Sequence, residues 1–281
     1  MKLKPFVKWA GGKRQLLKHL LPMIPHSYKV YHEPFLGGGA LLFAVQPHKA
    51  VINDSNKELM NCYKQIKYNC QELCELLTEH ESIENNRENY EDLRGTFNQK
   101  IISKAYDVEM ASLFLVLNKR CFNGLYRVNS KGLFNTPWNK EIKPVTVNDQ
   151  DNLKNISKYF NDNDIRIFDT DFINVLSLAH EDDFVFFDSP YVPLSDTANF
   201  DSYTKNKFTE NDHKTLANIY KMLDNKGVKE ILTNHNTSLV RELYAGYNIT
   251  EVVARRSINC DGKKRIEKEI IITNFETTKN F

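Results

Sequence analysis

Phe184-Val185-Phe186-Phe187-Asp188-Ser189-Pro190-Tyr191 is the segment that decides the fold of this chain. Its four consecutive apolar residues predict a strand that is buried on both faces, as in a parallel sheet. A carboxylate, a proline turn and an aromatic ring follow directly. Because open α/β sheets bind ligands beyond the carboxyl ends of their strands, the segment predicts a site at this point. A plain turn, with an exposed Asp188 and a packing Tyr191, is the alternative.

Four other short apolar runs also lead into polar residues. They are residues 30–32, 50–52, 165–168 and 229–232. Helical patterns lie between the runs, for example at 57–67 and 212–223. This alternation predicts an α/β fold with a mainly parallel sheet that helices cover on both faces.

The middle of the chain has a different pattern. Residues 56–118 are mainly helical in pattern, and residues 119–143 form an irregular, aromatic and basic stretch. We therefore expect a catalytic domain made of residues 1–55 and 145–281, with a helical insert at residues 56–144.

Composition excludes several classes of protein. The 281 residues include 38 Lys and Arg against 36 Asp and Glu, which rules out a globally polycationic binder but not an enzyme with a local basic surface. The 17 Phe and 13 Tyr argue against disorder. Residues 1–9 lack the apolar region that is typical of a signal peptide. The sequence also has no apolar run of the ~20 residues that a membrane span needs, and no C-x-x-C among its five cysteines. We expect a cytoplasmic protein without a membrane or metal partner.

Two glycine clusters indicate a backbone that approaches a ligand closely. They are Trp9-Ala10-Gly11-Gly12-Lys13 and Gly37-Gly38-Gly39, and the second opens a predicted helix after a predicted strand. Asp54 ends the next strand, where an acidic residue accepts ribose hydroxyls in nucleotide-binding folds. Since the dinucleotide and Walker A fingerprints are both missing, the pattern indicates a nucleoside site, with a plain glycine turn as the alternative.

The tetrad Asp188-Ser189-Pro190-Tyr191 resembles the Asp-Pro-Pro-Tyr signature of DNA methyltransferases that act on amino groups. The order of motifs is similar to that of their α group. Residues 7–13, 123–127, 198–200 and 255–258 are similar to the Dam-type adenine methyltransferases. The resemblance covers nearly the whole chain. It implies a Rossmann-like, S-adenosylmethionine-dependent methyltransferase sheet with an inserted, mainly helical DNA-recognition domain.

The resemblance implies methyl transfer from S-adenosylmethionine to N6 of adenine in double-stranded DNA, within GATC and by base flipping. Asp188 and the main-chain carbonyl of Ser189 would accept the two N–H bonds of the amine. Pro190 would shape the turn, and Tyr191 would stack on the flipped base. Because Ser189 replaces a proline and lacks its fixed φ, we expect a looser turn that costs ~0.4–1 kcal/mol of preorganisation.

The same resemblance implies the residues of the cofactor site. Lys13 or a backbone amide would meet the methionine carboxylate, and Asp54 would meet the ribose. Asp171 and Phe172 would lie near the cofactor adenine, although for Asp171 a solvated helix N-cap is an equal alternative. The implied cofactor-binding residues are Trp9, Ala10, Gly11, Lys13, Glu33, Phe35, Gly37, Gly38, Gly39, Asp54, Asp171, Phe172 and Asp188.

A second set of residues is implied for DNA recognition. Arg127 would read a guanine through a bidentate contact, with a phosphate contact as the alternative. Lys140 stands where the family has an arginine, and it lacks the guanidinium fork. The basic residues between 255 and 268 would grip phosphates, or would form a solvated hairpin. The implied DNA-binding residues are Lys8, Phe122, Asn123, Leu125, Arg127, Pro137, Lys140, Arg255 and Lys264.

Other interpretations stay open. One is a methyltransferase that acts on N4 of cytosine, on an RNA base or on a protein glutamine. Another is a DNA-binding relative whose catalysis is weakened at Ser189. A dehydrogenase is disfavoured, since it needs the dinucleotide fingerprint. The expected partners are double-stranded DNA and, as a candidate, a cognate restriction endonuclease, and we expect a monomer or a weak dimer on DNA.

Overall fold

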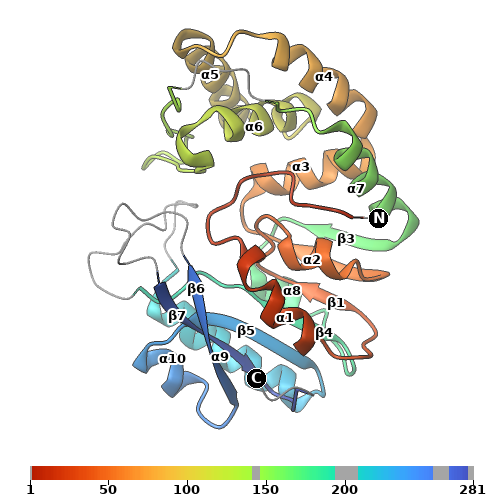
Figure 1. The fold of residues 1–281 in the computed structure, drawn as a ribbon, viewed down its shortest axis with the longest axis vertical. Helices are drawn as coiled ribbons and strands as arrows, with labels where there is room; N and C mark the ends of the chain where they lie inside the picture. Colours follow the sequence, from red (N-terminus) through yellow and green to blue (C-terminus); the bar gives the residue numbers. More distant parts are fainter. Residues whose placement is uncertain (1, 141–145, 194–207, 256–265, 278–281) are drawn as a thin grey trace.

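The computed structural model describes residues 2–140, 146–193, 208–255 and 266–277. Its centre is a seven-stranded sheet in the order β3-β2-β1-β4-β5-β7-β6 (Figure 1). The neighbours among the first five strands of this order are parallel, whereas β7 is antiparallel to both β5 and β6. The strands are β1 (Tyr31–Glu33), β2 (Lys49–Asn53), β3 (Asp164–Phe168), β4 (Phe184–Phe187), β5 (Lys229–His235), β6 (Asn248–Arg255) and β7 (Ile266–Thr273).

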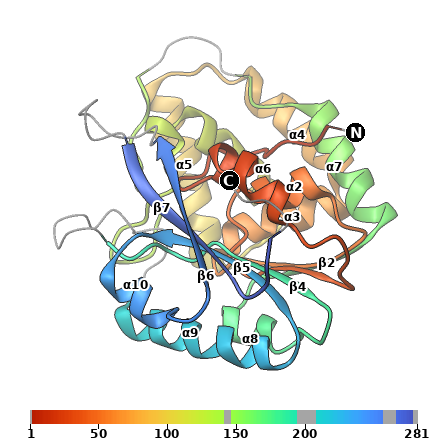
Figure 2. The ribbon, with the colours of Figure 1, turned by 60° about the horizontal axis from the view of Figure 1, so that its bottom comes forward.

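The mainly parallel α/β sheet is confirmed, and β4 has the predicted two-sided burial. Phe184 and Phe186 point into one hydrophobic core, whereas Val185 and Phe187 point into another, because successive side chains of a strand face opposite ways. Figure 2 shows the helices that cover the two faces. The first core includes α2 (Ala40–Val45), α3 (Lys57–Tyr68) and α7 (Gln150–Asp162), and the second includes α8 (Phe172–Leu176), α9 (Glu210–Asn225) and α10 (Ser238–Leu243).

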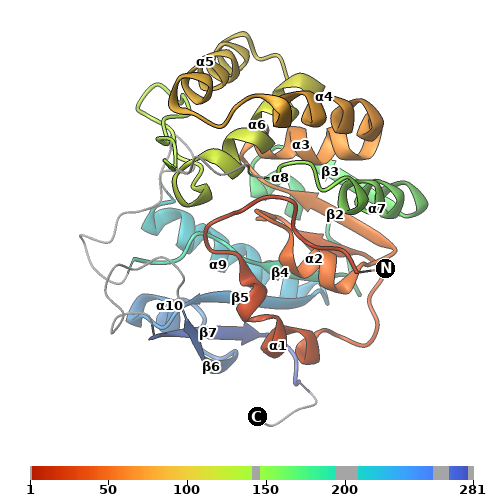
Figure 3. The same cartoon turned by 45° about the horizontal axis from the view of Figure 1, so that its top comes forward.

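Helices α4 (Cys70–Ser82), α5 (Arg87–Ser103) and α6 (Val108–Arg120) lie together at one end of the molecule (Figure 3). Asn86 and Asp107 set the starts of α5 and α6 by accepting a backbone N–H of the first turn. Helix α3 contacts both α6 and β3, so these helices continue the layer that covers the sheet. The division at residues 56 and 144 therefore stays a prediction.

The chain before β1 forms the short helical segments η1 (Lys13–Gln15), α1 (Leu17–Leu20) and η2 (Leu21–Met23). The cysteines at positions 62, 74 and 121 are buried free thiols, and Cys70 is a partly buried one. No helix within the described ranges combines the length and the hydropathy that crossing a membrane requires.

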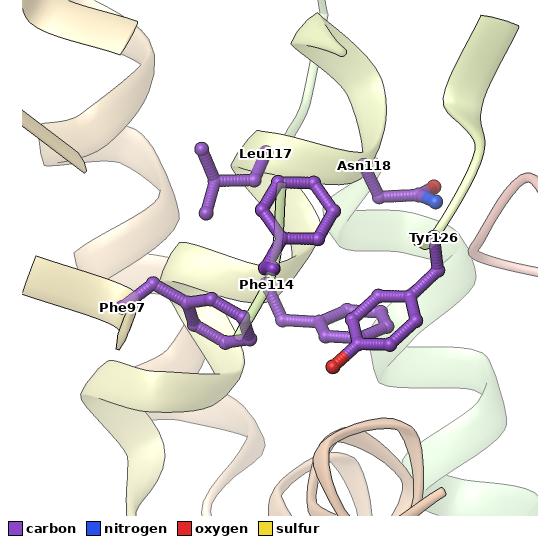
Figure 4. A pocket seen from close by; sticks show the side chains of 6 residues that line it. Phe97, Phe114, Leu117, Asn118 and Tyr126 are labelled. Atoms are coloured by element: carbon purple, nitrogen blue, oxygen red, sulfur yellow. The ribbon is translucent and has the colours of Figure 1, made fainter. Parts of the chain in front are cut away.

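Residues 121–140 follow α6 as an irregular hairpin, which we call the recognition segment. It begins with the short helix η3 (Phe122–Gly124). Isolated bridges join Cys121 to Trp138 and Val128 to Phe134. Tyr126 of this segment joins Phe97 and Phe114 in one group of aromatic rings (Figure 4). The ring centroids of Phe114 and Tyr126 are 5.3 Å apart. The irregular structure predicted from residue 119 begins only after α6 ends at Arg120, and it continues to residue 140. Residues 141–143 lie outside the described ranges.

Asn118, near the end of α6, ties the N-terminal segment to the recognition segment. Its Oδ1 accepts the N–H of Lys8 at 2.9 Å, and its Nδ2 donates to the carbonyls of Lys8 and Gly124 at 2.9 and 3.1 Å. Gly124 has a φ of +65°, and a Cβ there would lie 2.6 Å from the Lys8 side chain. The close approach of the two segments therefore requires glycine at this position.

Candidate active site

Three carboxylates meet at the carboxyl edge of the parallel strands. Glu33 ends β1, Asp54 follows β2 and Asp188 follows β4, and these strands are neighbours in the sheet. Burial raises the pKa of both Glu33 and Asp54, and the Asp188 carboxylate raises each of them further. The three groups are therefore within electrostatic range of one another, at the place where the sequence predicts a site.

Asp188 has a cation and a hydroxyl as direct partners. Its Oδ1 lies 2.8 Å from Nζ of Lys13 and accepts a hydrogen bond from Oγ1 of Thr233 at 2.9 Å. Burial raises the pKa of Asp188, whereas the Lys13 ammonium and the Thr233 hydroxyl act in the opposite direction. Lys13 is itself nearly buried and also donates to the carbonyl of Gly11 at 2.6 Å. Lys13, which belongs to the glycine-rich N-terminal segment, thus neutralises the charge of Asp188, the predicted catalytic residue.

Tyr191 faces the same ammonium. Nζ of Lys13 lies 4.4 Å from the centroid of its ring, and its hydroxyl donates to Oε2 of Glu269 at 2.9 Å. The His235 ring packs edge-on against it at 4.8 Å. Burial raises the pKa of Tyr191 well above its usual range, so the phenol stays neutral and remains a donor.

The end of β5 holds the turn that contains the tetrad. The N–H of Val192 donates to Oδ1 of Asn234 at 3.0 Å, and Nδ1 of His235 lies 2.7 Å from the Val192 carbonyl oxygen, to which it donates. Ser189 is buried, and its hydroxyl finds no hydrogen-bond partner among the described residues. The residue after the tetrad is therefore anchored, whereas the serine side chain contributes no bond.

The glycine turn between β1 and α2 forms a cradle without room for side chains. Gly37 and Gly39 have positive φ values of +50° and +67°. A Cβ on Gly37 would lie 2.8 Å from the Trp9 ring, and a Cβ on Gly39 would lie 2.8 Å from the Tyr63 hydroxyl. The Trp9 ring also stacks on Tyr126, with centroids 5.8 Å apart. The predicted residues Trp9, Gly37 and Gly39 therefore lie together.

Asp54 holds this turn through backbone contacts. Its Oδ2 accepts the N–H of Gly37 and its Oδ1 accepts that of Asn56, each at 2.9 Å. Glu33 lies close by, and burial raises its pKa to about 8, although a hydrogen bond from the Tyr31 hydroxyl at 2.7 Å opposes the rise. Glu33 is therefore largely protonated at neutral pH, until a cation approaches it.

Three more predicted cofactor residues, Phe35, Asp171 and Phe172, lie near the carboxyl ends of β1 and β3. Phe172 packs against Phe35, with ring centroids 5.1 Å apart, and Phe208 contacts both rings. Asp171 is exposed and caps α8 by accepting the N–H of Ile173 at 2.9 Å. The structure thus gives Asp171 the N-cap contact that the sequence left as an alternative.

Two features of the site go beyond the sequence interpretation. Lys13 pairs with Asp188, and its assignment to the methionine carboxylate, with a backbone amide as the alternative, stays a prediction. Thr233, Asn234, His235 and Glu269 contact the tetrad or the residue that follows it but were not assigned to the site. The predicted strand 229–232 leads directly into Thr233, Asn234 and His235, a signal that could have identified them. Glu269 offers no such signal, because its place depends on the antiparallel pairing of β7.

Most of the predicted DNA-binding residues gather on the recognition segment. Arg127 is exposed and donates from Nε and Nη2 to the side chain and carbonyl of Asn135, at 2.9 and 3.3 Å. Phe122 is 49% exposed, and Asn123 adopts a positive φ of 55°. The segment also contains Leu125, Pro137 and the exposed Lys140, and it contacts Lys8 at Gly124.

The predicted basic contacts near the C-terminus are described only in part. Arg255 ends β6, but its side chain lies outside the description. Lys264 and the motif residues 198–200 and 256–258 lie outside the described ranges altogether. Their assignment to DNA binding remains a prediction.

Comparison with known proteins agrees with this site. The family model of the "D12 class N6 adenine-specific DNA methyltransferase" matches residues 9–258. The chain is 45% identical over 274 residues to the type II methyltransferase M1.LlaDCHI of Lactococcus lactis subsp. cremoris, which covers 97% of this chain and 96% of that protein. It is 41% identical to the type II methyltransferase M.MjaIII of Methanocaldococcus jannaschii over 293 residues, covering 98% and 100%.

The match to a less similar relative also covers almost the whole length of both chains. The DNA adenine methylase of Escherichia coli K12 is 33% identical over 276 residues, a span that covers 94% of this chain and 92% of that protein. The match to the family model spans most of the chain and includes both glycine clusters and the tetrad. This chain therefore belongs to the D12 class of N6-adenine-specific DNA methyltransferases.

Proposed function

We propose that this adenine-specific DNA methyltransferase flips its target adenine out of a double-stranded GATC site and methylates N6 at Asp188 and Tyr191. The observation that carries the proposal is the position of the Lys13 ammonium. This nitrogen donor lies 2.8 Å from the Asp188 carboxylate and 4.4 Å from the Tyr191 ring centroid. An amino group that displaces Lys13 would meet the same carboxylate while its purine ring lies against the tyrosine.

The residues of the tetrad supply what a poor nucleophile needs. The lone pair of an aromatic amine is delocalised into its ring, so the nitrogen attacks only when it becomes pyramidal. Asp188 and the carbonyl of Ser189 accept its two N–H bonds and favour that geometry, and the burial of Asp188 strengthens the interaction. S-adenosylmethionine, when bound, supplies a methyl group that its sulfonium already activates. The protein then contributes mainly positioning and electrostatics.

The edge of the sheet suits a cationic nucleoside ligand. Glu33, Asp54 and Asp188 place three carboxylates around the glycine cradle, with Lys13 as the ammonium that pairs with Asp188. A sulfonium and an ammonium on the same ligand would offset this charge, while the cradle accepts a closely packed backbone contact. We assign the methyl donor to this edge, with Trp9, Phe35 and Phe172 as its aromatic boundary.

The recognition segment supports sequence-specific reading of DNA. Arg127 has an exposed guanidinium, and Phe122 of the same segment has an exposed apolar ring. A guanidinium matches the major-groove edge of guanine, and an apolar ring fills the gap that a flipped base leaves. We assign guanine reading within GATC to Arg127. Since two relatives are type II methyltransferases, we also propose a cognate restriction endonuclease as a partner.

The first experiment replaces Asp188 by Asn, which keeps the size of the side chain and removes its charge. We expect kcat to fall ~10²–10³-fold, the loss that follows removal of a transition-state electrostatic contact, with DNA affinity retained. Asp151→Asn, on the exposed face of α7, is the matched control for this substitution.

Long-read mapping of DNA from cells that express the wild-type chain should show N6-methyladenine in GATC. Methylation at another base or sequence would contradict the proposal.

Arg127→Ala tests the assignment of guanine reading. We expect binding to GATC to weaken by ~1–3 kcal/mol and discrimination against sites with a changed guanine to fall, because a bidentate base contact is lost. Titration of cognate and single-substitution duplexes at fixed salt measures both effects. A uniform loss across all sequences would instead make Arg127 a phosphate contact.

Lys13→Met tests the charge balance at Asp188 through pH. The Lys13 ammonium lowers the pKa of Asp188, so its removal should raise that pKa and protonate the carboxylate at higher pH. We therefore expect the acidic limb of kcat/KM for DNA, which reports the free enzyme, to move to higher pH when measured at saturating methyl donor. Lys13→Arg keeps the charge and should keep the profile. An unmoved limb in Lys13→Met would argue against this role.

Ser189→Ala tests the cost of the buried hydroxyl. Because this hydroxyl lacks a partner among the described residues, its removal should raise the free energy of unfolding by ~1–3 kcal/mol. Ser189→Pro should raise the free energy of unfolding by ~0.4–1 kcal/mol if the turn accepts proline without strain. Since the carbonyl of residue 189 is present in all three proteins, kcat should change little. Chemical denaturation and steady-state kinetics provide the measurements, and a destabilised Ser189→Ala would show that the hydroxyl is bonded.

A further inference from the structure

Glu269 connects the C-terminal hairpin to the tetrad. It lies on β7, where the antiparallel register places it directly opposite His235 of β5. Both residues contact Tyr191: the Glu269 carboxylate accepts its hydroxyl at 2.9 Å, and the His235 ring packs edge-on at 4.8 Å with an interplanar angle of 78°. Glu269 is only 7% exposed, so its hydrogen bond is shielded from water.

A stacking ring is useful only if its plane is fixed. The ring of a tyrosine turns about its side-chain torsions, and the energy of stacking depends on how the two ring planes lie. A hydrogen bond at the tip of the ring removes this freedom, and a charged acceptor makes the bond stronger than a neutral one. The edge-on His235 ring supports the same orientation from the side.

We propose that Glu269 is a positioning residue for the target adenine, which acts by orienting the Tyr191 ring through its hydroxyl. The inference rests on the proposed function, in which Tyr191 stacks on the flipped base. It gives the antiparallel strand β7 a role in catalysis. The parallel strands carry the carboxylates of the site, whereas the antiparallel strand fixes the ring.

A double-mutant cycle tests whether Glu269 acts through the Tyr191 hydroxyl. Glu269→Leu should lower kcat roughly tenfold, as expected for the loss of a hydrogen bond to a charged group. Glu269→Gln keeps a neutral acceptor and should lose only about threefold. In a Tyr191→Phe background both substitutions should have almost no further effect, since the hydroxyl through which they act is absent.

A second readout follows the base itself. DNA with 2-aminopurine at the target position becomes fluorescent when the base flips, and stacking on the tyrosine quenches that signal. We expect the complex of Glu269→Leu with DNA to be brighter than that of the wild type, while its affinity for the methyl donor is unchanged. Glu269→Gln should restore most of the quenching. Thermal unfolding tests whether each variant is folded. If Glu269→Leu is unfolded, the test rests on Glu269→Gln, through its effect on kcat in the wild-type and Tyr191→Phe backgrounds.

The possible failures can be told apart. If Glu269→Leu lowers kcat equally in the wild-type and the Tyr191→Phe backgrounds, the positioning role is overturned. The same holds if Glu269→Leu lowers kcat in neither background. If Tyr191→Ala leaves both kcat and the 2-aminopurine signal unchanged, the stacking role of Tyr191 in the proposed function fails instead. A loss in Tyr191→Ala combined with independent effects of Glu269 would reject only the inference about Glu269.

Discussion

The ion pair between Lys13 and Asp188 is the interaction on which the geometry of the site depends. Asp188 lies at the end of a strand buried on both faces, and desolvation there disfavours its charge. Asp54, which follows β2, adds a second carboxylate at this edge, whereas Glu33 is largely protonated at neutral pH. The Lys13 ammonium offsets this charge at 2.8 Å, and its approach fixes the glycine-rich segment against the sheet. The N-terminal residues are thus held at the tetrad by charge as well as by packing.

The parallel and the antiparallel strands of the sheet contribute residues to the site in different ways. Parallel strands β1, β2 and β4 end at one edge, so the residues at or after their ends converge without long side chains. The antiparallel strand β7 runs the other way and contributes a residue from within its length, Glu269, opposite the end of β5. A fully parallel sheet would present another strand end here. The antiparallel strand β7 instead contributes Glu269, whose carboxylate accepts the hydrogen bond from the Tyr191 hydroxyl.

The sequence predicted the parts of this arrangement that local patterns determine. The apolar run 184–187 became β4 without a shift, and Gly37 to Gly39 open α2 as expected. Lys13 was assigned to the site, but its pairing with Asp188 was not predicted, because that contact depends on a three-dimensional distance. Glu269 was not assigned, since no local pattern shows that β7 pairs with β5 as well as with β6, its neighbour in the chain. Long-range pairing is the information that a single sequence carries least directly.

The serine of the tetrad shows how neighbouring structure compensates for a local departure. A proline would fix φ at residue 189 through its own ring, whereas serine leaves that torsion to the surroundings. Here β5 holds the chain three residues later, where Asn234 accepts the N–H of Val192 and His235 donates to its carbonyl. Phe187 lies within the strand on the other side of the turn, so the turn is fixed at both ends. The preorganisation that proline provides covalently can therefore be supplied here by hydrogen bonds, which explains why a serine is compatible with an ordered tetrad.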